Sequence, residues 1–254
     1  MISLKNRNEI GKMRRAGRLV GRVLKMLENI IEPGISTGRL NALAEEECRR
    51  NGALPVFRNY PHPRGGRAFP AAICTSLNEE VVHGIPGSRL LKEGDIISID
   101  FGVILDGFAG DAAITVPVGQ VDSRVRKLIT TTEESLMRGI EQAQAGRRLG
   151  GVSQAIQEHA EKNCFSVVRD FVGHGIGRDM HEQPPVPNYG KRDRGPVLKE
   201  GMTIAIEPML NIGSYQVYTR SDEWTVVTRD GSWSAHFEHS IAITAGEPEI
   251  LTLR

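Results

Sequence analysis

The sequence carries one motif twice, and this repeat constrains the fold more than any other feature. Residues 91–100 read LKEGDIISID and residues 198–207 read LKEGMTIAIE, with six of ten positions identical and a carboxylate at the end of each. A second pair follows: residues 111–119 (DAAITVPVG) and residues 238–246 (EHSIAITAG) both begin with a carboxylate and share an Ile and a Gly at matching places. Two copies at so long a period do not make a solenoid. They predict two similar halves packed as a pseudo-symmetric pair, with shared sites at their junction.

The segments around the repeat have the patterns of helices and of an antiparallel hairpin. Apolar residues recur at helical spacing over residues 8–30. Further helices are expected over residues 36–52, 122–145 and 151–163. A strand pair over residues 95–116 turns at Asp106-Gly107, which is a strong hairpin signal.

No linker of biased composition divides the chain, so residues 1–254 are expected to form one α+β domain with halves of about 8–120 and 122–254. Lys and Arg number 32 and Asp and Glu 31, so the net charge of +1 does not ask for DNA or a membrane as partner. The amino-terminal segment has no signal-peptide pattern. Three widely spaced cysteines argue against disulfides and against a cysteine zinc site. We therefore expect a cytoplasmic protein and, with no evident assembly segment, a monomer.

The first expected helix has a basic outer face. Its members are Lys12, Arg14, Arg15, Arg18, Arg22 and Lys25. Such a face could touch ribosomal RNA, but a solvated surface is the simpler interpretation.

Strand periodicity indicates which way the repeated carboxylates point. Side chains alternate along a strand, so Ile97, Ile99 and Phe101 share one face while Asp100 lies on the other. The same alternation places the other repeated carboxylates among small residues, with aliphatic residues opposite. The four carboxylates are Asp100, Asp111, Glu207 and Glu238.

Four carboxylates on one sheet face would repel one another in a poorly solvated site unless cations lay between them. Paired divalent metal ions are a common hydrolytic arrangement. His174 is the best candidate for a nitrogen ligand, because it follows an apolar run (residues 165–172) and has glycines on both sides. A single acid or histidine is more often a surface or packing residue, but acids at repeat-equivalent positions favour two metal ions. Oxygen donors with one nitrogen suit Mn, Fe or Co, and Zn is also possible.

At these residues the sequence resembles the methionine aminopeptidases. The ordered set Asp100, Asp111, His174, Glu207 and Glu238 is similar to the five metal ligands of that family. The segments NEEVVHGIP, IDFGVILDGFAGD, HGIGRDMHEQP, AIEPML and FEHSIAIT match its pattern, so the resemblance covers essentially the whole chain. It implies the pseudo-two-fold "pita-bread" fold, an antiparallel sheet flanked by helices. The short interval between His174 and Glu207 resembles the bacterial type I branch.

The resemblance also implies roles for further residues. His83 would lie near the substrate amide, His181 would contact the scissile carbonyl, and Glu207 would shuttle a proton as well as bind metal. Walls of the methionine pocket would be Phe69, Cys74 and Trp224, with Tyr60 placed near them. The sequence departs from the family at Met180, where Phe is frequent, and over residues 57–68, which do not align with the usual pocket loop.

The implied activity is removal of the initiator methionine from nascent proteins that have a small second residue. A hydroxide generated at the two metal ions would attack the scissile carbonyl. Two alternatives remain: a hydrolase of the same fold that cleaves X-Pro bonds, and a binding protein that kept the fold but lost catalysis. The short chain and the HGIGRDMHEQP segment argue against the first, and the complete ligand set argues against the second.

Overall fold

The computed structural model describes residues 2–63 and 65–253, and a nine-stranded sheet dominates them. Its strand order is β1-β4-β5-β14-β9-β7-β8, with β2 paired to β4 and β15 to β14, and each of these pairings is antiparallel. The strands are β1 (Leu54–Pro55), β2 (Ile73–Leu77), β4 (Ile96–Leu105), β5 (Phe108–Pro117), β7 (Gly173–Gly175), β8 (Glu182–Val186), β9 (Thr203–Ile206), β14 (Glu238–Ala242) and β15 (Glu249–Ile250).

Two three-stranded sheets flank this large one, in the orders β13-β10-β6 and β11-β12-β3. Their strands are β3 (Glu80–Val82), β6 (Ser166–Val167), β10 (Met209–Asn211), β11 (Val217–Thr219), β12 (Val226–Thr228) and β13 (Ser234–His236). The apolar run at residues 165–172 contains only the short strand β6, which pairs with β10, whereas His174 lies in the separate strand β7, which pairs with β8 and β9.

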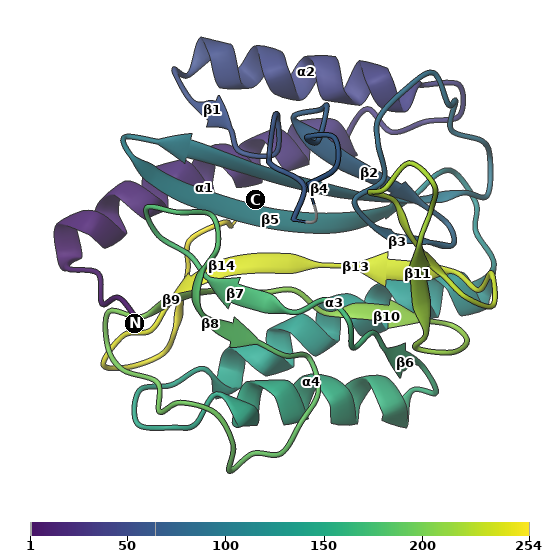
Figure 1. Ribbon diagram of the computed structural model, residues 1–254. Helices are drawn as coiled ribbons and strands as arrows, with labels where there is room; N and C mark the ends of the chain where they lie inside the picture. Colours follow the sequence, from purple (N-terminus) through teal and green to yellow (C-terminus); the bar gives the residue numbers. More distant parts are fainter. Residues whose placement is uncertain (1, 64, 254) are drawn as a thin grey trace.

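The four expected helices are present as α1 (Arg7–Glu28), α2 (Thr37–Arg50), α3 (Ser123–Gln142) and α4 (Gly150–Lys162). Short polar side chains begin three of them: Asn6 makes a capping box with Glu9, and Ser36 and Asp122 accept from the first turns of α2 and α3. In Figure 1 the α1–α2 pair lies beside β4 and β5 in the upper part of the view, and the α3–α4 pair lies in the lower part, beside the strands of the second half.

The main core lies between the helices and one face of the large sheet. Ile97, Ile99 and Phe101 of β4 are fully buried there, together with Val20 and Leu24 of α1. Burying one such side chain stabilises the fold by about 1.5–3 kcal/mol. Because strand side chains alternate, the residues between these apolar positions face away from the helices, and this second face is left for polar groups.

The predicted pseudo-symmetry is present in the sheet. Strands β4 and β5 of the first half pair as β9 and β14 do in the second, and the halves meet where Glu238 pairs with Ala113. The connection between the repeated strands differs in the second half. Asp230-Gly231 lies at a turn between β12 and β13, and residues 207–237 leave the sheet to form β10 to β13 before the chain returns as β14.

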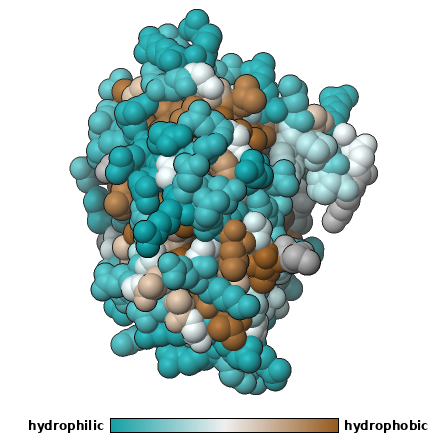
Figure 2. All heavy atoms as spheres, turned by 90° about the vertical axis from the view of Figure 1, so that its left-hand side faces the viewer, coloured by the Kyte–Doolittle hydropathy of each residue, from teal (hydrophilic) through white to brown (hydrophobic). Residues whose placement is uncertain are grey.

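The surface is mostly hydrophilic, with small separated apolar patches on the face seen in Figure 2. Among the described residues, none of the helices is long and apolar enough to cross a membrane. The basic face of α1 is partly neutralised, because Arg14 pairs with Glu249, Arg15 with Asp106 and Lys25 with Glu28. Fewer unpaired positive charges on this face are therefore available to bind RNA than the sequence alone indicates. Cys48, Cys74 and Cys164 are free thiols.

Candidate active site

Strand register assembles the candidate ligands in two neighbouring rows. In one row Asp100 and Glu238 both pair with Ala113, and Glu207 follows directly on Ile206, which pairs with the residue after Glu238. In the other row Asp111 lies opposite Gly102, and His174 and Ser240 both pair with Ala205. The small residues of each row separate the larger ligands. The repeat therefore delivers one carboxylate from each of four places along the central strands to a single patch.

The small residues are a steric requirement of this arrangement. A Cβ at Gly102 would lie 2.9 Å from Asp111 Oδ1 and 2.6 Å from a methyl group of Val56. Ser240 is small enough to accept from the Asp111 backbone N–H and donate to its carbonyl, at 3.1 and 2.7 Å. The absence of a side chain at Gly102 leaves room for the Asp111 carboxylate, and the two hydrogen bonds with Ser240 fix the backbone of Asp111.

The pKa values of the four carboxylates are strongly shifted. Burial raises the pKa of Asp111 to about 7, and burial together with the neighbouring carboxylates raises the pKa values of Asp100, Glu207 and Glu238 well above the usual range. Desolvation and like charge both disfavour the ionised form of an acid. Without counter-ions, several of these groups would have to hold protons at neutral pH.

His174 is oriented for ligation through Nε2. Its Nδ1 donates to the Gly175 carbonyl at 3.0 Å, so Nε2 keeps its lone pair. That Nε2 lies 3.9 Å from Asp111 Oδ2 and 3.7 Å from Glu207 Oε1. Burial lowers the pKa of His174 to about 3, which keeps the ring neutral and able to bind a cation.

The buried polar atoms of this patch fit divalent cations. Asp100 Oδ1, Asp111 Oδ1 and Glu238 Oε1 are buried and have no hydrogen-bond partner within the described part of the chain. Ligand atoms of Asp111, His174 and Glu238 lie within 4.8 Å of one another. Oxygen donors with one imidazole are a suitable set for first-row divalent metals. Unpaired buried oxygens are costly, and metal ions between them would remove that cost.

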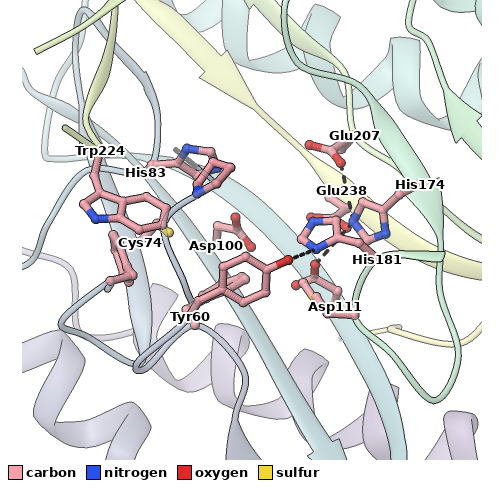
Figure 3. A pocket seen from close by; sticks show the side chains of 14 residues that line it. Tyr60, Cys74, His83, Asp100, Asp111, His174, His181, Glu207, Trp224 and Glu238 are labelled. Carbon is pink, nitrogen blue, oxygen red and sulfur yellow. Dashed lines mark hydrogen bonds and ion pairs between the residues drawn. The ribbon is translucent and has the colours of Figure 1, made fainter. Parts of the chain in front are cut away.

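One cavity of about 290 Å³ joins this patch to an apolar recess (Figure 3). Every candidate residue of the sequence analysis lines it: Tyr60, Phe69, Cys74, His83, Asp100, Asp111, His174, His181, Glu207, Trp224 and Glu238. Figure 3 shows the polar ligands at one end and Trp224 and Cys74 at the other. The structure thus brings together residues that lie far apart along the chain.

The apolar end is a small aromatic cluster. Phe69 and Trp224 meet edge to face with ring centroids 5.2 Å apart, and Cys74 lies buried beside them. The indole Nε1–H of Trp224 donates to the Arg67 carbonyl at 2.8 Å, which fixes the plane of the ring. Such a recess is suited to an unbranched apolar side chain.

Two further histidines line the cavity, His83 beside the apolar recess and His181 beside the candidate metal ligands. His83 has a positive φ of 60°, an unusual backbone conformation for a residue with a side chain, and its ring contacts Phe171 and Trp224. His181 lies against His174, with ring centroids 4.3 Å apart, and hydrogen-bonds Tyr60. Burial lowers the pKa of His83 to about 4, so this ring is neutral at physiological pH.

Sequence reasoning missed several residues at the site. Phe57 and Pro63 line the cavity, although the segment 57–68 gave no pattern from which to place them. Met180 was not missed: it is the named departure from the family pattern, and it also lines the cavity. His236 is buried, and its Nε2 lies 3.8 Å from Glu207 Oε2. Strand periodicity places His236 on the face of Glu238, but sequence reasoning gave this residue no role at the site.

Comparisons with known proteins agree with this geometry. The model of metallopeptidase family M24 matches residues 11–245. Methionine aminopeptidase from Clostridium acetobutylicum is 53% identical over 254 residues, which covers 100% of this chain and 99% of that protein. The crystal structure of methionine aminopeptidase from Rickettsia prowazekii superposes with a TM-score of 0.95 at 44% identity, covering 100% of both chains.

A more distant structure shares only the architecture. The Xaa-Pro dipeptidase from Bacillus anthracis has a TM-score of 0.76 at 20% identity, and the match covers 98% of this chain but 61% of that one. The common part is the pita-bread fold. The end-to-end identity with methionine aminopeptidases is far more specific, and with the family model it shows that this chain belongs to metallopeptidase family M24 and to its methionine aminopeptidases.

Proposed function

We propose that the protein is a metal-dependent aminopeptidase that removes the N-terminal methionine from nascent polypeptides and prefers a small second residue. The observation that supports this most is the single cavity in which buried, unpartnered carboxylate oxygens adjoin an apolar recess. The polar end suits hydrolysis and the recess suits a methionine side chain. Together with the family, this favours an exopeptidase over a binding protein.

We assign the metal ligands by residue. Asp100, Asp111, His174, Glu207 and Glu238 would hold two divalent ions, with Mn, Fe or Co the best matches to the donor set and Zn possible. Ions bound there would supply Lewis-acid chemistry, acidifying a water molecule and polarising the scissile carbonyl.

The remaining steps fall to the side chains. The Glu207 carboxylate would take the proton of the attacking water and pass it towards the departing amine. His181 would donate a hydrogen bond to the carbonyl oxygen as negative charge develops there. His83 would position the amide nitrogen, while Phe69, Cys74, Trp224 and Tyr60 would enclose the methionine side chain. A pocket of this kind distinguishes one methylene by about 1–3 kcal/mol.

Peptide hydrolysis by metal-stripped protein would test the function. Mn, Fe, Co and Zn are added back separately, with Met-Ala-Ser, Leu-Ala-Ser and Ala-Pro-Ser as substrates. We expect release of methionine only, and only with metal. Cleavage of the proline peptide would move the chain to the X-Pro hydrolases, and no turnover with any metal would leave the binding-protein alternative.

We expect His181→Ala to lower kcat about 100-fold while changing KM little, because a donor that acts on developing charge is missing mainly in the transition state. Steady-state kinetics on Met-Ala-Ser measure both constants. His159→Ala is the matched control, because His159 pairs with Glu134 on the helical side, away from the cavity. A raised KM with unchanged kcat would assign His181 to substrate binding instead.

Three broader features belong to the same proposal. Residues 1–254 would act as one catalytic domain, with internal halves of about 8–120 and 122–254. The enzyme would work as a cytoplasmic monomer on nascent chains. Contact with the ribosome through the basic face of α1 would be tested by co-sedimentation of wild type and a variant with Arg18 and Arg22 reversed to Glu. Equal co-sedimentation of both would exclude that helix as the contact.

A further inference from the structure

One hydrogen bond at the cavity connects a residue of the unusual 57–68 segment with a proposed catalytic group. The Tyr60 hydroxyl lies 2.7 Å from His181 Nδ1, and the two rings meet edge to face with centroids 5.5 Å apart. In Figure 3 a dashed line joins the Tyr60 hydroxyl to the His181 imidazole. Tyr60 is therefore more than a wall of the methionine recess, the place that the sequence analysis assigned to it.

The backbone around Tyr60 is held firmly enough to aim this hydroxyl. The Tyr60 N–H donates to the Phe57 carbonyl at 2.9 Å, and the Tyr60 carbonyl accepts from the Phe69 N–H at 3.0 Å. The Asn59 N–H donates to the Phe69 carbonyl at 2.8 Å. Residues 57–60 are thus fastened to the start of the segment that leads into β2, whose Cys74 pairs with Asp100. The phenol is therefore held by backbone that connects directly to the sheet carrying the candidate metal ligands.

The chemistry of the two groups favours one direction for the hydrogen bond. A neutral imidazole has one N–H donor and one acceptor nitrogen, and its neighbours select the tautomer. Burial raises the pKa of Tyr60, so the phenol keeps its proton. The structure gives the Tyr60 hydroxyl one partner among the described residues, His181 Nδ1. If the phenol donates, its proton is satisfied, whereas accepting from Nδ1–H would leave that proton without a protein acceptor.

We propose that Tyr60 is a positioning residue that donates to Nδ1 of His181 and thereby keeps the imidazole proton on Nε2. The inference rests on the proposed function, in which His181 must donate to the carbonyl oxygen. With the proton on Nδ1, the same ring would present a lone pair to that oxygen and repel it. The hydroxyl also fixes the plane of a ring that is otherwise exposed at the cavity mouth.

The tautomer can be measured without any reaction. Ring ¹⁵N chemical shifts of His181 in zinc-loaded protein, which is diamagnetic, distinguish a protonated nitrogen from an unprotonated one. We expect the Nε2–H form in wild type and a mixture of forms in Tyr60→Phe, which removes one oxygen and keeps the aromatic wall. An Nδ1–H form in wild type, or an unchanged Nε2–H form in the variant, would overturn the proposal.

Kinetics provide a second readout that a purely structural role would not produce. We expect Tyr60→Phe to lower kcat about tenfold with KM for Met-Ala-Ser nearly unchanged, as for the loss of one well-placed hydrogen bond. In a His181→Ala background the same change should have no further effect, since Tyr60 acts through His181. Tyr218→Phe, on the exposed strand β11, is the matched control. Additive losses in the double variant would show that the phenol contacts substrate directly.

The two hypotheses fail in distinguishable ways. If wild type releases no methionine, the proposed function fails whatever the tautomer. If wild type releases methionine but Tyr60→Phe keeps both its kcat and its tautomer, the function stands and the role of Tyr60 is wrong.

Discussion

Replacing Asp111 by asparagine is expected to lower kcat/KM for methionine release on the order of 1000-fold or more while leaving the fold intact. Asp111 offers a buried, unpartnered Oδ1 and an Oδ2 that lies 3.9 Å from His174 Nε2. Asparagine has nearly the same shape as aspartate. The hydrogen bonds with the Ser240 hydroxyl are made by the backbone of residue 111, so the substitution leaves them in place. The variant therefore removes charge and one ligand atom without creating a void.

Thermal unfolding separates loss of metal from loss of fold. Added metal should raise the Tm of wild type, because a ligand that binds only the native state stabilises it. The same metal concentration should raise the Tm of Asp111→Asn much less, and the metal-free variant should be at least as stable as metal-free wild type, since one member of a repelling group is gone. Asp106→Asn, at the exposed hairpin tip, is the matched control. Full activity in Asp111→Asn would overturn the metal assignment.

Metal-free protein is expected to lose stability as the pH rises from about 6.5 to 8.5, with a fall in Tm on the order of 5 °C. The pKa of Asp111 is raised to about 7, and those of Asp100, Glu207 and Glu238 are also raised. In this window the native state binds protons that the unfolded chain, with pKa values near 4, has already released. Stability must therefore decrease with increasing pH.

Buried histidines act in the opposite direction, but at lower pH. The pKa values of His83, His174 and His236 are lowered by burial to about 4, 3 and 3, so folding opposes their protonation. Their contribution is lost as the pH falls below about 6.5, where the unfolded histidines take up protons. The unfolded histidines are neutral by about pH 7.5, and from there the decline is due mainly to the carboxylates. Near pH 8.5 the thiols of Cys48 and Cys74, whose pKa values burial also raises, add to it.

Scanning calorimetry at several pH values, with and without saturating metal, checks this prediction. Metal holds the carboxylates ionised in the native state, so the decline between pH 6.5 and 8.5 should largely disappear in loaded protein. Asp111→Asn should show a smaller decline than wild type when both are metal-free. A metal-free Tm that rises over this range would mean that the carboxylates are ionised without counter-ions, which the burial of Asp111 and Glu238 makes unfavourable.

The repeat made much of this architecture predictable. The similar motifs at residues 91–100 and 198–207 predicted two equivalent strands, and alternation placed Asp100 and Glu207 on the face opposite the core. Helix starts were readable because short polar residues accept from free backbone N–H groups of the first turn. Periodicity and capping are local properties, so a single sequence contains them.

The connections could not be predicted in the same way. Asp230-Gly231 has the turn signal of the first hairpin, yet the chain between β9 and β14 folds into separate strands, because partner choice depends on distant segments. The pairing of Tyr60 with His181 likewise depends on how residues 57–60 fasten to Phe69, and no periodic pattern encodes that contact. Sequence reasoning found the residue but not its partner.

The long connection between β9 and β14 means that different segments of the chain supply the carboxylates and the walls of the apolar recess. The duplicated strands supply the charged residues, whereas Trp224 comes from this connection and Tyr60 and Phe69 come from a connection in the other half that has no counterpart. Apart from Tyr60 and Cys74, the residues that enclose the side chain and those that generate the nucleophile therefore lie in different parts of the polypeptide. Redesign of which amino-terminal residue is accepted can be confined to residues 65–69 and 220–225, with Tyr60, Cys74 and the hydrolytic residues left unchanged.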